Sequence, residues 1–243
     1  MAESRQVVAI GSDARARRLT AAVHNNAAWC DAVCRAHGVP TSWQSDWWAA
    51  RQRSPRFYPD AITLRPGAAF AAVAGSVEAG RGSSVKDSWA DLDLEPYGFT
   101  PLFDAHWITL NPPARGETVA AADRFRWTVV GSAHELLDWT AAHGADGTFP
   151  PSLLADPAIR FLAVRSAGRT VAGAIANLSG PVVGVSNVFG EDPWQGLVHA
   201  VGNCFPQRPL VGYEQAAELD RPLSLGFHTI GQLRVWHQPE ADG

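Results

Sequence analysis

The hydrophobic pattern of the first half of the chain predicts one helix followed by short strands. Apolar positions recur at helical spacing over residues 14–37, and Gly38 with Pro40 ends that run. Residues 41–60, rich in Trp and Arg, are predicted to be an ordered loop or short helices. The remaining predicted elements of this half are strands at 61–64, 84–89 and 100–110 and a helix at 68–78.

The second half has a more regular pattern of alternating strands and helices. Ser132, with Glu135 three residues later, is a good N-cap for a helix. Pro193 stands at the favoured first position of another helix. The predicted strands are 125–130, 159–165, 170–177, 182–189, 210–214 and 231–237, and the predicted helical segments are 133–143, 149–155, 192–205 and 216–225.

A segment with two Pro and a Gly, residues 111–117, separates these halves and is the best linker in the chain. It predicts a smaller N-terminal α/β domain over 1–112 and a second domain over 124–240. The fold class is α/β, and α+β in detail. We expect the two domains to pack together because the linker is short, with the ligand site in the cleft between them.

Composition narrows the classes of function. A net charge of −4, with 19 Arg and one Lys, gives no basic footprint for nucleic acid. The sequence has no apolar run of transmembrane length and no secretory signal pattern, which predicts a protein that is not membrane-bound. Three Cys fit a reduced, cytoplasmic protein. The sequence leaves a homodimer open.

Three segments of the second half carry a resemblance to a known family: Arg160–Ile175, Val182–Phe189 and Leu223–Gly231, the last containing Leu-Gly-Phe-His. Their order resembles the Gcn5-related N-acetyltransferase (GNAT) superfamily, over roughly residues 124 to 238. The resemblance implies a mixed central sheet flanked by helices. It also implies transfer of an acyl group from acyl-CoA, such as acetyl-CoA, to the amine of a small molecule.

In that family a Gly-rich loop after the fourth strand leads into a helix whose N–H groups hold the pyrophosphate of coenzyme A. The matching stretch here begins at Phe189 and is shorter than the usual loop. Glu191 and Asp192 place negative charge there, and Asp192 is expected to cap the helix itself. The cofactor-binding residues that the resemblance implies are Val185, Val188, Phe189, Gly190, Trp194 and Gly196.

The catalytic candidates are one pair at the end of a predicted strand and one pair within another. The family's usual Tyr acid falls at Pro222, so Tyr213 and Glu214 are the nearest substitutes, as acid and base. Ser186 and Asn187 are polar residues inside a Val-rich strand and are candidates to hold an oxyanion. Each pair also has a structural interpretation: Tyr packing with a solvated Glu, and polar groups that satisfy the sheet.

Three further features leave alternatives open. Lys86 is the single Lys, and it is either a reactive base or nucleophile or an ordinary solvated or ion-paired residue beside Asp87. Cys30, Cys34 and His37 share a helix face that suits either zinc or the core, and we predict no metal. The preceding Asn25-Asn26 pair could line a pocket or satisfy backbone groups.

The first half also contains a faint echo of the second. Residues 84–110 run strand, short helical segment, Tyr-Gly-Phe-Thr and strand, and residues 210–238 run strand, helix, Leu-Gly-Phe-His and strand. The N-terminal half is therefore either a partial GNAT repeat or a chance likeness. The function predicted first is an N-acyltransferase, and the alternative is a non-catalytic GNAT-fold binding or regulatory protein without the pyrophosphate loop.

Overall fold

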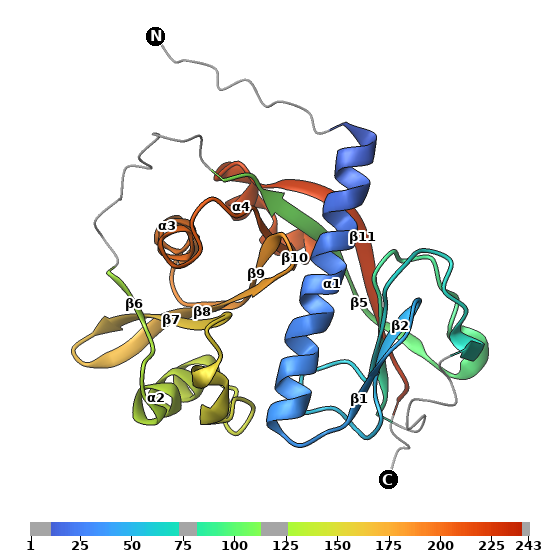
Figure 1. Cartoon of the computed structure of the whole chain (residues 1–243), viewed down its shortest axis with the longest axis horizontal. Helices are drawn as coiled ribbons and strands as arrows, with labels where there is room; N and C mark the ends of the chain where they lie inside the picture. Colours follow the sequence, from blue (N-terminus) through green and yellow to red (C-terminus); the bar gives the residue numbers. More distant parts are fainter. Residues whose placement is uncertain (1–10, 73–81, 113–125, 240–243) are drawn as a thin grey trace.

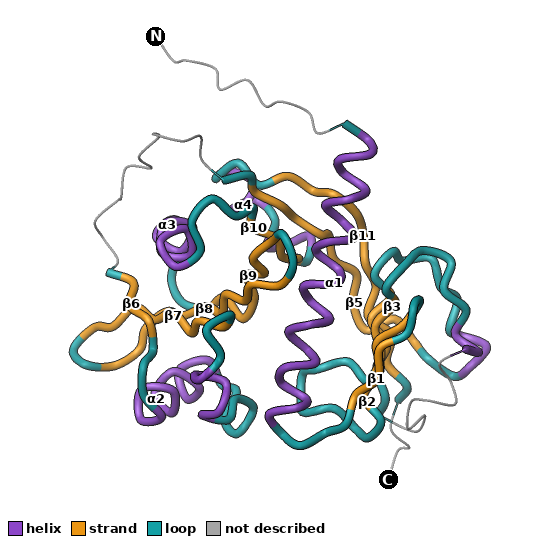
Figure 2. Tube along the Cα trace, in the orientation of Figure 1, coloured by secondary structure: helices purple, strands orange, loops and turns teal. Residues whose placement is uncertain are grey.

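A single mixed sheet runs through both halves of the chain (Figures 1 and 2). The computed structural model describes residues 11–72, 82–112 and 126–239. In these residues the spatial order of the strands is β1-β2-β3-β4-β11-β5-β10-β9-β8-β7-β6. The strands are β1 (Thr41–Trp43), β2 (Trp47–Ala50), β3 (Ala61–Thr63), β4 (Ser84–Asp87), β5 (Thr100–Leu110), β6 (Trp127–Val129), β7 (Ile159–Ser166), β8 (Arg169–Ser179), β9 (Val182–Phe189), β10 (Leu210–Glu214) and β11 (His228–His237).

Helices cover both faces of this sheet, as Figure 1 shows for α2 and α3 on opposite sides of β7 and β8. Alternation along β7 explains the two layers: Phe161 belongs to the core under α1 and α2, and Leu162 to the core under α3. None of the helices in the described part of the chain is long and apolar enough to cross a membrane. The helices are α1 (Ser12–Ala36), α2 (Ala133–His143), α3 (Trp194–Cys204) and α4 (Asp220–Ser224).

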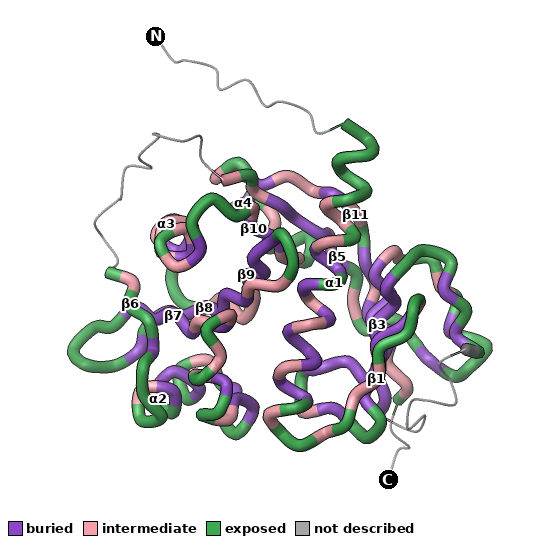
Figure 3. Tube along the Cα trace, in the orientation of Figure 1, coloured by how far each residue is buried: buried purple, intermediate pink, exposed green. Residues whose placement is uncertain are grey.

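The helix α1 starts in solvent, and the turns between Ala22 and Cys34 pack into the core. Its first turns are exposed, and from Ala22 onward most of its residues are buried against the sheet (Figure 3). The buried stretch packs against β8, β9 and β11, which places Asn26, Trp29 and Cys30 beside the middle of the sheet. The N-cap predicted for α2 is confirmed, since the Glu135 N–H donates to Ser132 Oγ at 3.2 Å.

The last long strand of each half of the chain lies between strands of the other half. The strand β5 lies between β10 and β11, with Trp107 opposite Tyr213, and β11 lies between β4 and β5, with Val235 opposite Lys86. The sheet is therefore continuous between the two halves, although residues 113–125 separate them in the sequence. The division into 1–112 and 124–240 stays a prediction about the chain.

The two halves match in strand direction. Among the described strands, two pairs are parallel, β3 with β4 and β9 with β10. After each pair come a short helical turn, a left-handed glycine (Gly98, φ 81°; Gly226, φ 93°) and a buried phenylalanine (Phe99, Phe227). These positions are the structural counterpart of the echo in the sequence.

Two predicted elements of the first half differ from the structure. Residues 41–60 were predicted as loop or short helices, which is wrong in part, because β1 and β2 form a hairpin that buries Trp47 and Trp48 in two different cores. Of the predicted helix 68–78, the described part is a 3-10 turn at Phe70–Ala72, and residues 73–78 lie outside the described residues.

The predicted helix 216–225 is present but split. A 3-10 turn at Ala216–Glu218 precedes α4, and Leu219 separates the two.

Candidate functional site

The parallel strands β9 and β10 open into a wedge. They pair at Leu210 with Val183 and at Val211 with Gly184, and beyond these positions the pairing stops. The end of the pairing is followed by a bulge in β9 against β8, at which Asn187 takes a left-handed conformation (φ 52°). Such bulges bend a strand and redirect its side chains, so the ends of β9 and β10 face a gap.

That gap forms one side of a pocket of about 250 Å³. Its wall comes from β9 and β10, from the buried turns of α1, from the segment Phe57–Pro59, and from Lys86 of β4. The residues of the wall are Asn26, Trp29, Cys30, Phe57, Tyr58, Pro59, Lys86, Val185, Ser186, Asn187, Val188, Tyr213 and Glu214. Lys86, Ser186, Asn187, Tyr213 and Glu214, the five catalytic residues predicted from the sequence, therefore lie around one pocket.

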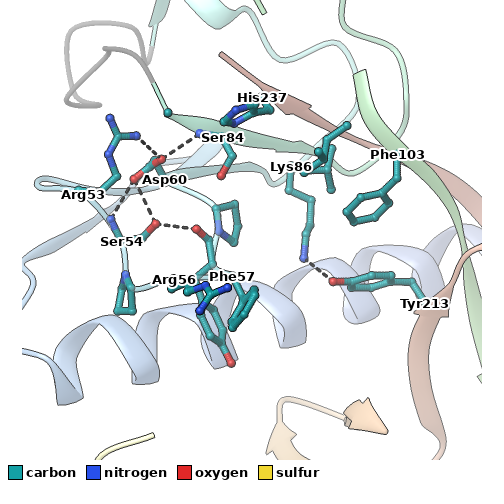
Figure 4. A pocket seen from close by; sticks show the side chains of 16 residues that line it. Arg53, Ser54, Arg56, Phe57, Asp60, Ser84, Lys86, Phe103, Tyr213 and His237 are labelled. Carbon is teal, nitrogen blue, oxygen red and sulfur yellow. Dashed lines mark hydrogen bonds and ion pairs between the residues drawn. The ribbon is translucent and has the colours of Figure 1, made fainter. Parts of the chain in front are cut away.

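A second, larger pocket of about 700 Å³ adjoins the first on the side of the N-terminal half (Figure 4). Phe57, Tyr58, Pro59, Lys86 and Tyr213 line both pockets, so they stand at the junction. The remaining wall of this larger pocket comes from Arg53–Arg56, from Asp60, Gly82 and Ser84, and from Leu102, Phe103, Val235 and His237. The two pockets form one site with a narrow inner part and a wide outer part.

Glu214 is the best candidate base. It is half-buried at the end of β10, and its carboxylate makes no hydrogen bond or ion pair with the described residues. Burial, followed by the charge of Glu218, raises the pKa of Glu214 to about 7. A carboxyl group with a pKa near neutrality exchanges protons readily at physiological pH, which suits general base catalysis.

Lys86 and Tyr213 meet at the junction of the two pockets. The Lys86 ammonium group donates to Asn26 Oδ1 at 2.8 Å and to the Tyr213 hydroxyl oxygen at 3.2 Å, and it lies 4.5 Å from the Tyr213 ring centre. The ring packs edge-on against Trp107 at 5.5 Å. Because the Tyr213 oxygen accepts from Lys86, its own hydrogen is available to another acceptor in the pocket.

Ser186 and Asn187 bond to each other, with Asn187 Nδ2 donating to Ser186 Oγ at 3.0 Å. Both also line the inner pocket. Of the Asn25-Asn26 pair, Asn25 satisfies backbone, donating to the carbonyls of Asn177 (3.0 Å) and Val182 (3.2 Å), whereas Asn26 lines the pocket. The two interpretations of that pair thus apply to one residue each.

Sequence reasoning missed the contribution of Tyr58. Its side chain is 9% exposed, its hydroxyl has no hydrogen-bond partner among the described residues, and the side chains of Asn187 and Trp29 lie beside it. Burial raises the pKa of Tyr58 well above its usual value, so the hydroxyl stays protonated. The available signal was its place in the Trp- and Arg-rich segment 41–60, which the sequence predicts to be an ordered loop or short helices.

The residues implied for cofactor binding divide into two groups. Val185 and Val188 line the inner pocket. Phe189 packs against Trp139 at 5.1 Å, and Trp194 packs against Phe227 at 5.3 Å, so both rings belong to cores. The other two are Gly190 and Gly196.

Gly190 has a packing role, because a Cβ there would meet the Cβ of Ala172 at 2.4 Å. Gly196 lies in the first turn of α3. The cofactor assignments stay predictions.

The expected cap of α3 by Asp192 is wrong. The helix has no side-chain cap, and the Asp192 carboxylate instead forms a two-pronged ion pair with Arg221 of α4, at 2.5 and 2.8 Å. The left-handed backbone of Asp192 (φ 44°) turns the residue out of the capping position. The first N–H groups of α3 are therefore left without a cap, and Arg221 offsets one of the two acidic charges at this end.

The positions of Cys30, Cys34 and His37 do not support the zinc site that their spacing left open. Cys30 and Cys34 are buried in the core, and His37 Nε2 lies 2.8 Å from the Thr148 carbonyl oxygen. No group of three or more metal-ligating side chains occurs in the part of the chain that the structure describes.

Comparison with solved structures identifies the fold. A GCN5-related N-acetyltransferase from Kribbella flavida superposes with a TM-score of 0.59 at 17% identity, covering 90% of this chain and 96% of the other. A GNAT-family protein from Novosphingobium aromaticivorans gives 0.57 at 14% identity, with 86% and 97% coverage. A conserved protein of unknown function from Staphylococcus epidermidis gives 0.57 at 12% identity, with 83% and 95% coverage.

No protein-family model matches the sequence, and no curated protein matches it significantly. The identities above are low, so the likeness concerns the fold. These structures cover nearly the whole chain, including the N-terminal half. The chain has the fold of the GCN5-related N-acetyltransferases.

Proposed function

We propose that the protein is an N-acyltransferase that moves an acyl group from an acyl-CoA to the amine of a small molecule. One observation carries the proposal: the wedge between β9 and β10 opens onto a pocket in which Glu214 has no partner and Tyr213 can donate a hydrogen bond. A base and an acid beside the same gap are what aminolysis of a thioester requires.

The five catalytic candidates of the inner pocket each have a role in this chemistry. Acyl-CoA, when bound, supplies an activated acyl carbonyl. Glu214 takes a proton from the attacking amine, directly or through water, and Tyr213 gives a proton to the leaving sulfur. Ser186 and Asn187 donate hydrogen bonds to the carbonyl oxygen as negative charge develops on it. Lys86 holds the Tyr213 hydroxyl in position.

The fit of coenzyme A rests on this chain's own groups. The uncapped N–H groups at the start of α3 favour a phosphate, and the Arg221–Asp192 pair removes part of the negative charge that opposed it. Glu191 remains exposed and acidic at the same end. Val185 and Val188 offer apolar contact for the pantetheine arm. The residues therefore fit the cofactor, with Glu191 as the opposing element.

Calorimetric titration with acetyl-CoA and with S-acetyl-pantetheine, which lacks the nucleotide and pyrophosphate, tests this proposal. We expect acetyl-CoA to bind more tightly, because only it reaches α3. Glu191→Gln should tighten acetyl-CoA binding several-fold and leave S-acetyl-pantetheine unchanged, since a like charge is removed beside the phosphates. If neither acetyl-CoA nor S-acetyl-pantetheine binds, the acyltransferase proposal is wrong.

The second candidate is a non-catalytic binding or regulatory protein with the same fold. Glu191 and the proline at position 222, where the family has its Tyr, favour it. Under this alternative the pocket binds a small molecule, and no thiol is released from acetyl-CoA in the presence of any amine.

We also infer that the N-terminal half is a partial copy of the C-terminal half. The matching parallel pairs, left-handed glycines and buried phenylalanines support this, as does the reciprocal exchange of β5 and β11. Neither a sequence echo nor a shared strand order alone would carry it.

A further inference from the structure

Lys86 is a buried cation without an acidic partner. Its side chain lies in β4 and the residue is 3% exposed, yet both groups that it bonds, Asn26 and Tyr213, are neutral. No carboxylate of the described residues forms an ion pair with it. A buried charge is costly unless it is paired, so an arrangement of this kind indicates an anion that arrives from outside.

The neighbouring Asp87 does not supply that anion. Successive side chains of a strand point to opposite faces, and the Asp87 carboxylate accepts hydrogen bonds from the backbone N–H groups of Trp89 (3.3 Å) and Leu92 (2.9 Å). The ion-paired interpretation of Lys86 from the sequence therefore does not hold for this neighbour.

The wide outer pocket also carries an excess of positive charge. Arg53, Arg56 and Lys86 line it, with Asp60 as its acidic residue (Figure 4). Asp60 is already engaged, by Arg53 at 2.8 Å and by the backbone N–H groups of Ser54 and Ser84 at 2.9 Å. Positive charge from Arg56 and Lys86 is therefore left over in the pocket, which attracts an anionic ligand.

The mouth of this pocket carries an aromatic ring held in a strained conformation. Phe57 has a left-handed backbone (φ 74°) and is 63% exposed, although it lines both pockets. The Arg56 guanidinium lies 4.5 Å from its ring centre. Residues with a strained backbone cluster at active sites and ligand-binding segments, and Phe57 offers an apolar wall beside the positive charge.

We propose that the acceptor amine carries a carboxylate on an apolar or aromatic body, and that Lys86 and Arg56 bind this carboxylate in the outer pocket. This inference rests on the proposed function, in which the amine itself reaches Glu214 in the inner pocket. The two pockets meet at Lys86 and Tyr213, so one molecule can place its amine in one and its carboxylate in the other.

The test is binding of a matched pair of probes to the full chain without coenzyme A: phenylacetate and phenylacetamide, which differ in charge and little in shape. We expect phenylacetate to bind at least about tenfold more tightly by calorimetry or ligand-observed NMR, because a charge-assisted hydrogen bond has no counterpart in the amide. Phenyl phosphate is the third probe, and tighter binding by it than by phenylacetate would overturn the carboxylate assignment.

Variants locate the effect. Lys86→Gln should abolish the preference for phenylacetate, Lys86→Arg should retain part of it, and Arg56→Gln, on the exposed rim, should weaken it without affecting folding. Arg51→Gln removes a nearby exposed Arg outside both pockets and should change nothing.

Equal binding of the two probes, or no binding of either, overturns the inference. Acetyl-CoA titration is unaffected by that result, so failure of this inference is distinguishable from failure of the acyltransferase proposal.

Discussion

The two parallel strand pairs, β3 with β4 and β9 with β10, have the same direction and the same place in their halves, but they end differently. Beyond β3 and β4 the gap is filled by the protein: the Ser88 N–H donates to Thr63 Oγ1 at 2.7 Å and Ser88 Oγ donates to the Thr63 carbonyl at 2.8 Å. Trp107 then donates to the Ser88 carbonyl at 2.9 Å. Beyond β9 and β10 no such bridge closes the gap among the described residues, and it remains a pocket.

The acids at the two strand ends show the same contrast. The carboxylate of Asp87 accepts backbone N–H groups, and that of Glu214 has no partner among the described residues. Burial raises the pKa of both, and for Glu214 the value reaches about 7. The strand topology provides a gap in each half, and the side chains at its edges decide whether it becomes core or site.

The largest expected effect follows from separating the halves. Both neighbours of β5 come from the second half, and both neighbours of β11 come from the first. Expressed alone, residues 1–112 and 124–243 should therefore each lack a cooperative thermal transition, because each would leave its longest exchanged strand unpaired. Mixing or co-expressing the two fragments should restore the transition, as followed by circular dichroism.

A cooperative transition in the isolated 124–243 fragment would mean that the exchange of strands is not required for folding. It would also support the division into two domains, 1–112 and 124–240, that the linker at 111–117 predicts.

Sequence reasoning reached the order of elements because periodicity and caps are local signals. It found β5, β7–β11 and α2 within a few residues, and the cap at Ser132 is confirmed. It missed the hairpin β1–β2, because Trp-rich short strands without strict alternation resemble a loop. It could not anticipate the exchange of β5 and β11, because which strands become neighbours depends on packing between the halves.

The candidate site could also be predicted only in part. The residues at strand ends, Ser186, Asn187, Tyr213 and Glu214, lie together because strands of one sheet end at a shared gap. Tyr58 was missed, because it reaches the pocket from a segment with no periodic signal. The cap at Asp192 was predicted wrongly, because the Arg221 that captures it is 29 residues away in sequence.

The second prediction compares the two acids in catalysis. Glu214→Gln should reduce acyl transfer by about 100-fold or more, because it removes the proposed general base while keeping the shape of the side chain. The measurement is release of thiol from acetyl-CoA with the acceptor found by screening. The matched change, Asp87→Asn, should leave the rate within about threefold and lower the melting temperature instead, because Asp87 holds backbone N–H groups. Full activity of a folded Glu214→Gln variant would take the base role away from Glu214.

The third prediction uses the pH dependence of stability. The folded pKa of Glu214 is about 7 against an ordinary 4.5, so the folded state binds more protons than the unfolded state between these values. The contribution of Glu214 to stability is therefore lost as pH rises through this window. Glu214→Gln should be equal in stability to the natural protein below pH 4.5 and more stable above pH 7, by up to about 3 kcal/mol. Urea unfolding at pH 4, 6 and 8 measures this difference, and a gap that is the same at all three would show that Glu214 keeps an ordinary pKa.

The fourth and smallest prediction concerns the bridge that distinguishes the two gaps. Ser88→Ala removes the donor to the Thr63 carbonyl in a fully buried place and should lower the free energy of unfolding by about 1–2 kcal/mol, with no loss of acyl transfer. Ser186→Ala, in the open gap, should cost about 0.5 kcal/mol or less and should slow acyl transfer, because Ser186 is only partly buried and lines the pocket. Denaturant unfolding and thiol release on both variants separate the two roles. If Ser186→Ala proved as destabilising as Ser88→Ala and equally active, the polar residues of β9 would be closing the sheet, and the gap between β9 and β10 would be a structural feature like its counterpart between β3 and β4.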